Sequence, residues 1–469
     1  MIDLPPDDTA KSSSPPPANT RGHKPRAKKS NASTGLKSEI DHFVRHVSSL
    51  NDTLPLAMLA IRAGSKRADE KYQDFIRDHC EVETKAEGQM IRFKAELQEE
   101  FNRLRNRHER GRLAFLVVPR SLVVALVSQF DAFLGSLIRI YYAIHPEALT
   151  SSERNVTLAQ LESFGSIDAA KEFILEKEVE SVLRMSHGEQ FEWMENRFGL
   201  PLRKGLENWP AFIELTERRN LFVHTSGIVS SQYLTVCKKH SVQCEMGVKP
   251  GTRLGVDPAY FAKAFECVFE IGVKLSHVFW RKMLPKDRTD ADLHLNAVTY
   301  ELLGDGEYKL AKELLDFACI TLKTYSSEQS RRIFVVNRAQ AYKWLGVADE
   351  ARKIMDAEDW TASSDDFRMA DLVLRDKFED AGELMRKIGG SGDVSRMDYA
   401  NWPLFREFRK SNEFADAFRE VFGEPFDGIA NASKGGIDSE EGPATNTLNV
   451  DQTEARSDDA GQSSASAVE

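Results

Sequence analysis

The sequence predicts an all-α protein with two helical blocks between polar tails. Strict alternation of apolar and polar residues, the mark of a half-buried strand, is scarce, whereas apolar residues spaced three or four apart recur along most of the chain. Residues 83–112 consist largely of good helix formers. Three segments after residue 285 can be superimposed as helix–turn–helix units. We therefore expect a helical domain over residues 38–285 and helical repeats over residues 286–426.

Both ends of the chain are predicted to be disordered. Residues 1–37 are rich in Ser, Pro, Lys and Arg, and contain seven basic residues against three acidic ones. Residues 427–469 carry nine acidic and two basic residues, so the net charge of −10 is partly a property of this tail. The basic stretch at residues 21–30 could attract nucleic-acid phosphates, but a linker or solubilising segment is the favoured interpretation.

The first block is predicted to place a new helix after the one at residues 83–112. Pro119 suits the first turn of this helix, where a missing N–H is tolerated. Apolar residues three or four apart then form one stripe: Leu122, Leu126, Phe130, Phe133 and Leu137. Asp131 and Arg139 interrupt the apolar run, which favours a buried helix over a membrane span of about 20 mainly apolar residues.

Shorter helices are predicted after this apolar helix. They cover residues 157–163, 167–185, 187–197 and 211–224. The block closes with a long helix that has Asp257 as its N-cap and Pro258 at its first position.

The second block repeats one pattern of apolar and small residues. The three copies are Tyr308-x-x-Ala311-x-x-Leu314-Leu315, Ala348-x-x-Ala351-x-x-Ile354-Met355 and Phe378-x-x-Ala381-x-x-Leu384-Met385. The pattern resembles degenerate tetratricopeptide repeats, which implies a concave surface that binds a protein partner. A terminal helix pair is expected to cover the last repeat with its aromatic residues: Trp402, Phe405, Phe408, Phe414, Phe418 and Phe422.

Cysteine usage and the N-terminus favour a cytosolic protein. The five cysteines are an odd number and are scattered, as expected of reduced thiols, and the N-terminus has no apolar signal-peptide core. Cys237, His240 and Cys244 could in principle meet a metal, but no second ligand pair follows at zinc-finger spacing. No metal or cofactor is therefore predicted.

The stretch TERRNLFVHTSGIVSSQYL, residues 216–234, holds the candidate site. If it begins as a helix, Asn220 and His224 share a face because they lie four apart. Arg219 lies about 140° round the helix from His224, and its long side chain can reach the same edge. Because an unpaired arginine in a core is costly, this cluster should face solvent, a second subunit or a ligand.

These residue types suit the cleavage of RNA. RNA carries its own nucleophile, the 2′-hydroxyl, so an enzyme needs only to move two protons and stabilise the charged phosphorane. Histidine is the natural acid or base because its pKa is close to neutrality, and arginine binds phosphate oxygens in a fork. The alternative is a structural role, in which an Arg and a His only solvate or cap a helix end.

The hexapeptide Arg219-Asn220-Leu221-Phe222-Val223-His224 resembles the signature of the HEPN superfamily of all-helical ribonucleases. The polar and then apolar HTSGIVSSQYL looks like the continuation of that helix, and VSQFDAFLGSLIR resembles the family's other core helix. The resemblance implies that His224 is the general acid/base, Arg219 the phosphate clamp and Asn220 an orienting group. Asp131 stands where the family often has a glutamate, as a supporting residue. Arg218 also fits the spacing, but the adjacent asparagine favours Arg219.

The resemblance also implies partners and a biological setting. Such ribonucleases form two-fold dimers that bring both motifs into one cleft, cut RNA without a metal, and often act as toxins or defence effectors. The alternative is a non-catalytic scaffold, in which the repeats recruit a partner and the first block only dimerises.

Overall fold

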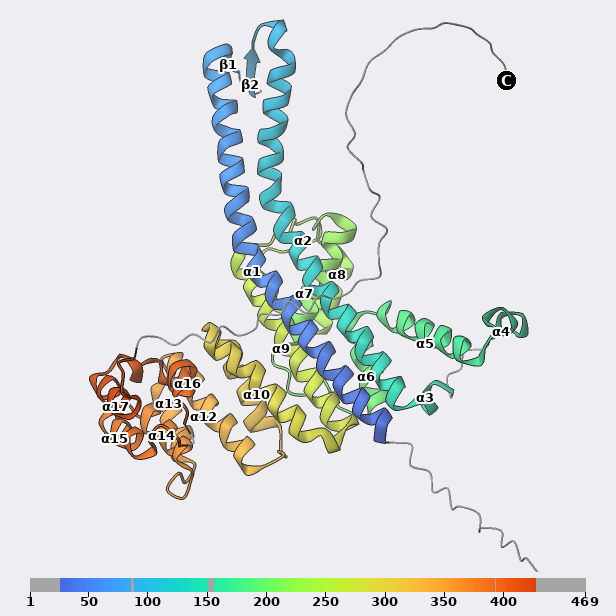
Figure 1. Cartoon of the computed structure of the whole chain (residues 1–469). Helices are drawn as coiled ribbons and strands as arrows, with labels where there is room; N and C mark the ends of the chain where they lie inside the picture. The colour runs from blue at the N-terminus through green and yellow to red at the C-terminus, as the bar shows by residue number, and fades with distance from the viewer. Residues whose placement is uncertain (1–25, 86–87, 151–155, 393, 427–469) are drawn as a thin grey trace, which may run out of the picture.

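Figure 1 shows the computed structural model of the chain, which describes residues 26–85, 88–150, 156–392 and 394–426. These residues are mainly helical, which confirms the predicted all-α class, and the one sheet among them is a two-stranded hairpin. The predicted tail at 427–469 lies outside the described residues, as do residues 1–25. Residues 26–37 were wrongly assigned to the first tail. Helix α1 begins at Arg26, and Leu36 is buried in the core.

Two long helices run through the centre of the first block and extend beyond it. Helices α1 (Arg26–His79) and α2 (Gln98–Ile144) lie side by side, and their distal halves project beyond the other helices as an arm (Figure 1). A hairpin of β1 (Glu81–Lys85) and β2 (Gly88–Arg92) joins them, followed by the short 3-10 helix η1 (Ala95–Leu97).

The hairpin corrects the helix predicted over residues 83–112. Helix α2 begins only at Gln98, and residues 81–85 pair with residues 88–92 as antiparallel strands instead. The apolar Val82 and Ile91 lie directly opposite each other, and Phe93 stacks on Phe101 at 4.4 Å between ring centroids. Cross-strand and ring contacts of this kind override a helical preference that rests on composition alone.

Pro119 does not begin a helix, contrary to the prediction. It lies inside α2, which runs without a break to Ile144, and α1 likewise contains Pro55. A proline in a helix interior removes one backbone hydrogen bond. The extensive packing of α2 along α1 keeps the helix continuous, because tertiary contacts outweigh local propensity.

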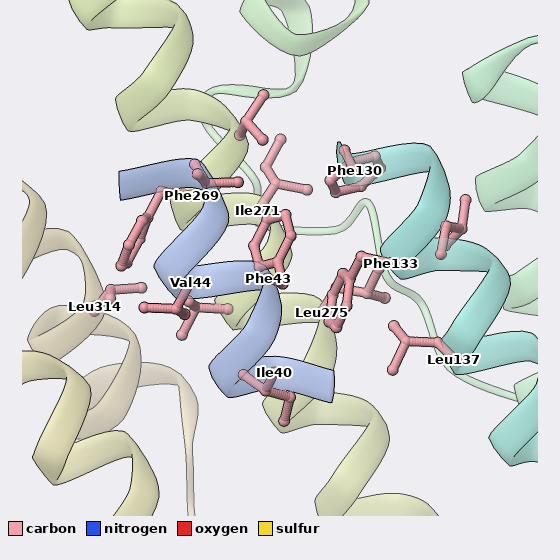
Figure 2. Packing of buried hydrophobic residues seen from close by; sticks show 14 of the residues in the cluster. Ile40, Phe43, Val44, Phe130, Phe133, Leu137, Phe269, Ile271, Leu275 and Leu314 are labelled. Atoms are coloured by element: carbon pink, nitrogen blue, oxygen red, sulfur yellow. The ribbon is translucent and has the colours of Figure 1, made fainter. Parts of the chain in front are cut away.

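The main core lies where α1 and α2 meet α9 (Pro258–Met283). Phe43 of α1 stacks on Phe133 of α2 with ring centroids 4.4 Å apart, and both lie close to Leu275 of α9 (Figure 2). Gly272 of α9 makes this approach possible, since a Cβ atom there would meet the Phe43 ring at 2.2 Å. The predicted apolar stripe of α2 is confirmed, because Leu126, Phe130, Phe133 and Leu137 are buried and Leu122 packs against the same core.

Four further helices of the first block confirm the predicted positions to within a few residues: α4 (Leu158–Phe164), α5 (Ile167–Leu183), α6 (His187–Phe198) and α7 (Trp209–Thr225). The short α3 (Pro146–Thr150) and the separate helix α8 (Ser231–Lys239) were not predicted. Asp257 caps α9 as predicted, because its Oδ1 accepts a hydrogen bond of 2.7 Å from the Tyr260 N–H.

The second block consists of stacked helix pairs, as the repeated pattern predicts. After the short turn η2 (Pro285–Asp287), the pairs are α10 (Arg288–Asp305) with α11 (Tyr308–Asp316), α12 (Glu328–Trp344) with α13 (Ala348–Asp356), and α14 (Asp365–Leu374) with α15 (Phe378–Ile388). A π-helical turn, η3 (Phe317–Thr321), extends α11. The three alanines of the pattern, Ala311, Ala351 and Ala381, are all buried.

The end of the second block differs from the predicted helix pair. It contains the short α16 (Arg396–Asn401), the 3-10 turns η4 (Pro403–Arg406) and η5 (Phe408–Lys410), and only one longer helix, α17 (Asn412–Phe422). The predicted covering role of the aromatic residues is confirmed, because they join the core cluster of the last repeats: Trp402, Phe405, Phe408, Phe414, Phe418 and Phe422.

The two blocks share one core across the predicted boundary at residue 285. The main hydrophobic cluster continues from α9 into the first helix pair, where Leu310 and Leu314 belong to it, and it reaches Phe334 of α12. A second cluster begins in α12 and covers the later repeats. The first helix pair of the second block is therefore packed as part of the first block.

Within the described residues, one helix passes a length and hydropathy test for a membrane span. It covers Ala95–Ile144, and 28% of its most apolar window is buried. A single such helix is weak evidence for a span, because core helices pass the same test.

Candidate functional site

Helix α7 carries the candidate motif and ends sooner than the sequence suggests. The predicted continuation of the helix through HTSGIVSSQYL is wrong, because α7 stops at Thr225 and Ser226 adopts a left-handed conformation with φ 53°. Gly227 follows with φ 85°, and a Cβ atom there would lie 2.9 Å from the Leu254 carbonyl oxygen. Position 227 therefore requires a glycine, and the two left-handed residues turn the chain out of the helix.

Arg218 points to the buried side of α7. Its Nε donates to Glu214 Oε1 at 2.6 Å, its Nη1 donates to the Gly255 carbonyl at 3.1 Å, and its guanidinium lies 4.0 Å from the centroid of the Tyr260 ring. Burial opposes its charged form, but Tyr260 and Glu214 raise the pKa of Arg218 above its ordinary value. With these partners Arg218 is a structural residue, and Arg219 is the arginine on the open side.

Arg219 belongs to a chain of polar contacts between three helices. Its Nη2 donates to Asp131 Oδ2 on α2 at 2.6 Å, and its Nη1 donates to Asn220 Oδ1 at 3.1 Å. The other oxygen of Asp131 accepts a bond of 2.9 Å from Nε2 of His187, the first residue of α6. The predicted residues Arg219, Asn220 and Asp131 therefore lie together, with Arg219 still 24% exposed.

Sequence reasoning missed His187 and Glu217. The side chain of His187 is 7% exposed, and it lies 56 residues from Asp131, too far for any spacing pattern to reveal the pair. Glu217 accepts a bond of 3.4 Å from Asn220 Nδ2, and burial raises the pKa of Glu217 despite the opposing effects of His187 and Asn220. The cluster therefore holds two carboxyl groups in different surroundings.

His224 stands apart from this cluster. It is exposed, and among the described residues its ring has no hydrogen bond or ion pair. It lies about 7.5 Å further along the helix axis than Arg219, since each residue of an α-helix rises about 1.5 Å. The expected direct meeting of guanidinium and imidazole is thus not seen within one chain.

Two further arginines converge on the end of α7 beside His224. Arg120 Nη1 and Arg253 Nη1 both donate to the Ser226 carbonyl oxygen, at 3.2 and 3.3 Å. Arg120 also donates to the Leu254 carbonyl at 2.9 Å. Burial lowers the pKa of Arg120, and the charge of Arg253 lowers it further. This concentration of positive charge was not evident from the sequence.

Exposed apolar residues lie near the end of α7. Val223 is exposed on α7, and Leu113, Leu116 and Val117 are exposed on α2, each over about half of its surface. Leu116 lines the same open pocket as Arg253, so the α2 residues adjoin the arginines at the end of α7. Exposed apolar residues in one region mark candidate contact surfaces.

The residues considered for a metal do not converge on one point. The His240 ring faces Trp209, whose Nε1 donates to its Nδ1 at 3.4 Å, whereas Cys237 is buried in a different environment, among Leu221, Val229 and Leu254. Among the described residues, no group of three or more His, Cys, Asp or Glu side chains could hold a metal ion.

No family model matches the chain, and no curated protein or solved structure is significantly similar to it.

Proposed function

We propose that the chain is a metal-independent endoribonuclease whose site lies on the open side of α7. The observation that supports the proposal most directly is the combination of partners and exposure at Arg219. Asp131 and Asn220 hold its guanidinium in place, yet the side chain remains partly exposed on the same helix as the exposed His224. Each Nη of Arg219 donates only one of its two hydrogens to these partners, so two N–H groups remain for phosphate oxygens.

In this proposal the imidazole of His224 takes the proton from the 2′-hydroxyl of RNA. The 2′-oxygen attacks the adjacent phosphorus, and the bond to the 5′-oxygen breaks as that oxygen gains a proton from a second imidazole. The products are a 2′,3′-cyclic phosphate and a free 5′-hydroxyl. Arg219 stabilises the charge on the phosphorane, and Asp131, held by His187, keeps Arg219 oriented.

The second imidazole is supplied by a second copy of the chain. One described chain presents one exposed histidine on α7, His224, and the exposed apolar residues near the end of α7 give a surface on which two copies can associate. Val117→Asp places a charge on this exposed surface without disturbing the core. We expect Val117→Asp to leave the fold unchanged, to convert a dimer into monomers in sedimentation, and to abolish RNA cleavage.

RNA cleavage by the purified protein tests the proposal. We expect cutting that persists in EDTA and leaves 2′,3′-cyclic phosphate ends, with at least about a hundredfold loss in His224→Ala, the scale of a lost acid/base group. Arg219→Ala should lose activity similarly. His79→Ala, an exposed histidine at the end of the arm, is the matched control and should cut normally. Cutting that requires a metal, or that survives His224→Ala, would refute the proposal.

A toxic effect on cells is the simplest biological consequence. Expression of an active ribonuclease should slow growth, and His224→Ala should relieve that effect. The proposal as a toxin or defence effector depends on this result, because no residue of the chain by itself specifies such a role.

A non-catalytic scaffold is the second candidate, favoured by a groove in the second block. Helices α10, α12 and α14 line this groove with Tyr300, Ile333 and Phe367, and Asn296 Oδ1 accepts a bond of 2.8 Å from Asn337 Nδ2 at its base. Stacked helix pairs commonly bind a partner on such a surface. A cellular effect that survives His224→Ala but is lost in Ile333→Asp would favour the scaffold.

A further inference from the structure

Two cysteines flank the turn that follows α8. Cys237 lies in the last turns of α8 and is buried, whereas Cys244 is exposed and lines an open pocket with Tyr233 and Tyr260. The chain doubles back between them, because the Val242 N–H donates to the Cys237 carbonyl at 2.9 Å and Ser241 adopts a left-handed conformation with φ 57°. This turn brings the two cysteines back toward each other, and Cys244 is near enough to contribute to the raised pKa of Cys237.

We propose that Cys237 and Cys244 form a reversible intramolecular disulfide when the protein meets a peroxide. The structure supplies the two features that such a site needs: one exposed thiol that reacts first, and one buried thiol beside it that completes the bond. This inference is independent of whether the chain cleaves RNA.

The reaction proceeds in two balanced steps. The Cys244 thiolate attacks one oxygen of hydrogen peroxide, the O–O bond breaks, and the departing hydroxide gains a proton to become water, which leaves a sulfenic acid. The Cys237 sulfur then attacks the Cys244 sulfur. The S–O bond breaks, and the second hydroxide leaves as water with the proton of the Cys237 thiol. Two thiols lose two electrons and two protons, and one peroxide is reduced to two waters.

The order of the two steps follows from the surroundings of each sulfur. Burial, together with Cys244, raises the pKa of Cys237 to about 12, so Cys237 holds little thiolate for a first attack on peroxide. Cys244 is open to solvent and is the thiol that peroxide can reach. Once Cys244 is a sulfenic acid, the turn that brings Cys237 back toward it favours closure over further oxidation.

The other described cysteines lack this arrangement. Cys267 is buried and its Sγ donates to the Asn208 carbonyl at 3.8 Å, although its residue borders the same pocket as Cys244. Cys80 follows α1 at the distal end of the arm, and Cys319 lies in the second block. Burial raises the pKa of both Cys267 and Cys319.

The disulfide would tighten a segment that holds the end of α7. Glu245, next to Cys244, pairs with Arg218 at 3.3 Å, and the Leu254 N–H donates to the Gly227 carbonyl at 2.8 Å. The bond would tie the start of this segment to α8 through a loop of six intervening residues. Amide hydrogen exchange over residues 241–248 should therefore become slower in the oxidised protein.

Peroxide treatment of the reduced full chain, followed by alkylation and mass spectrometry without reductant, tests the proposal. We expect two of the five thiols to become protected from alkylation, a peptide pair linked through Cys237 and Cys244, and full recovery after dithiothreitol. Cys244→Ser should abolish the linked pair and should fold normally because the site is exposed. Cys237→Ser should leave a Cys244 sulfenic acid that dimedone traps.

Cys80→Ser is the matched control, and it should form the Cys237–Cys244 bond as fast as the natural chain. Three results would each overturn the proposal. They are a bond from Cys244 to Cys267, a bond between two chains, and a Cys244 thiol that still reacts with the alkylating reagent after peroxide has oxidised Cys80. The two proposals fail independently. A variant that still forms the Cys237–Cys244 bond but does not cleave RNA would count against the proposed ribonuclease function and not against the disulfide.

Discussion

The two sides of α7 hold neighbouring arginines in opposite conditions. Arg218 is enclosed by a carboxylate, a backbone carbonyl and an aromatic ring, and its side chain is 8% exposed. Arg219 is three times as exposed and is held from one direction by Asp131 and Asn220. The difference separates a residue that supports the fold from one that has capacity left for a ligand, although both fit the motif spacing.

Arg218→Ala should have the largest effect on the free energy of unfolding. It leaves Glu214 buried without its positive partner and removes the stacking on Tyr260, so we expect a loss of about 3–5 kcal/mol. Urea unfolding followed by circular dichroism measures this loss. If Arg218→Ala were as stable as Arg219→Ala, the two sides of α7 would not differ in the way the contacts indicate.

Asp131→Ala should have the next largest effect. It removes the shared acceptor of Arg219 and His187 and leaves two partly buried donors without a partner, which costs about 1–3 kcal/mol. Glu172→Ala is the matched control, because it breaks an exposed ion pair with Arg139 and should cost at most about 1 kcal/mol. Equal losses in the two variants would show that the Asp131 cluster is no more than a surface contact.

The sequence predicted well those features that depend on local patterns. The three alanine positions of the repeats, the Asp257 cap and the apolar stripe of α2 were all correct, because helical spacing and capping are decided by neighbouring residues. The hairpin at residues 81–92 and the continuity of α2 through Pro119 were missed. The hairpin depends on cross-strand and ring contacts, and the continuity of α2 depends on its packing along α1. Local propensity registers neither.

The candidate site was predicted only in part, because some of its residues are set by local spacing and others by contacts between elements. The proximity of Asn220 to Arg219 follows from their positions on one helix, and the place of Asp131 beside them came from a resemblance. His187, Arg120 and Arg253 reach α7 from other elements, and no spacing in the chain reveals them. The separate orientations of Arg218 and Arg219 also depend on what α9 and the segment around Glu245 place beside them.

Glu217→Gln should change how stability depends on pH. The pKa of Glu217 is raised in the folded protein, chiefly by burial, so the folded state holds this proton at pH values where the unfolded chain has lost it. Stability therefore falls as the pH rises from the ordinary glutamate value through the raised one. Glu217→Gln removes this fall, and the variant should be the more stable protein at neutral pH.

Unfolding free energies from about pH 4 to about pH 8 test this expectation, since the titration of a raised carboxyl lies in that window. The gap between the variant and the natural protein should open as the pH rises and should be small at the acid end. Glu99→Gln, an exposed carboxylate in the first turn of α2, is the control and should show no such gap. A gap that opens toward acid would mean that the folded state favours ionised Glu217.

Of these variants, His224→Ala should have the smallest effect on the free energy of unfolding and the largest effect on RNA cleavage. The side chain is exposed and, among the described residues, has no bonded partner, so its removal should alter the free energy of unfolding by no more than about 0.5 kcal/mol. The same substitution removes the acid/base group on which the proposed cleavage depends. Arg218→Ala should therefore lose more stability than His224→Ala, whereas His224→Ala should lose more RNA cleavage, when cleavage is expressed per folded molecule. Both quantities are measured on both variants. A stable His224→Ala protein that still cuts RNA would leave the open side of α7 without a catalytic role.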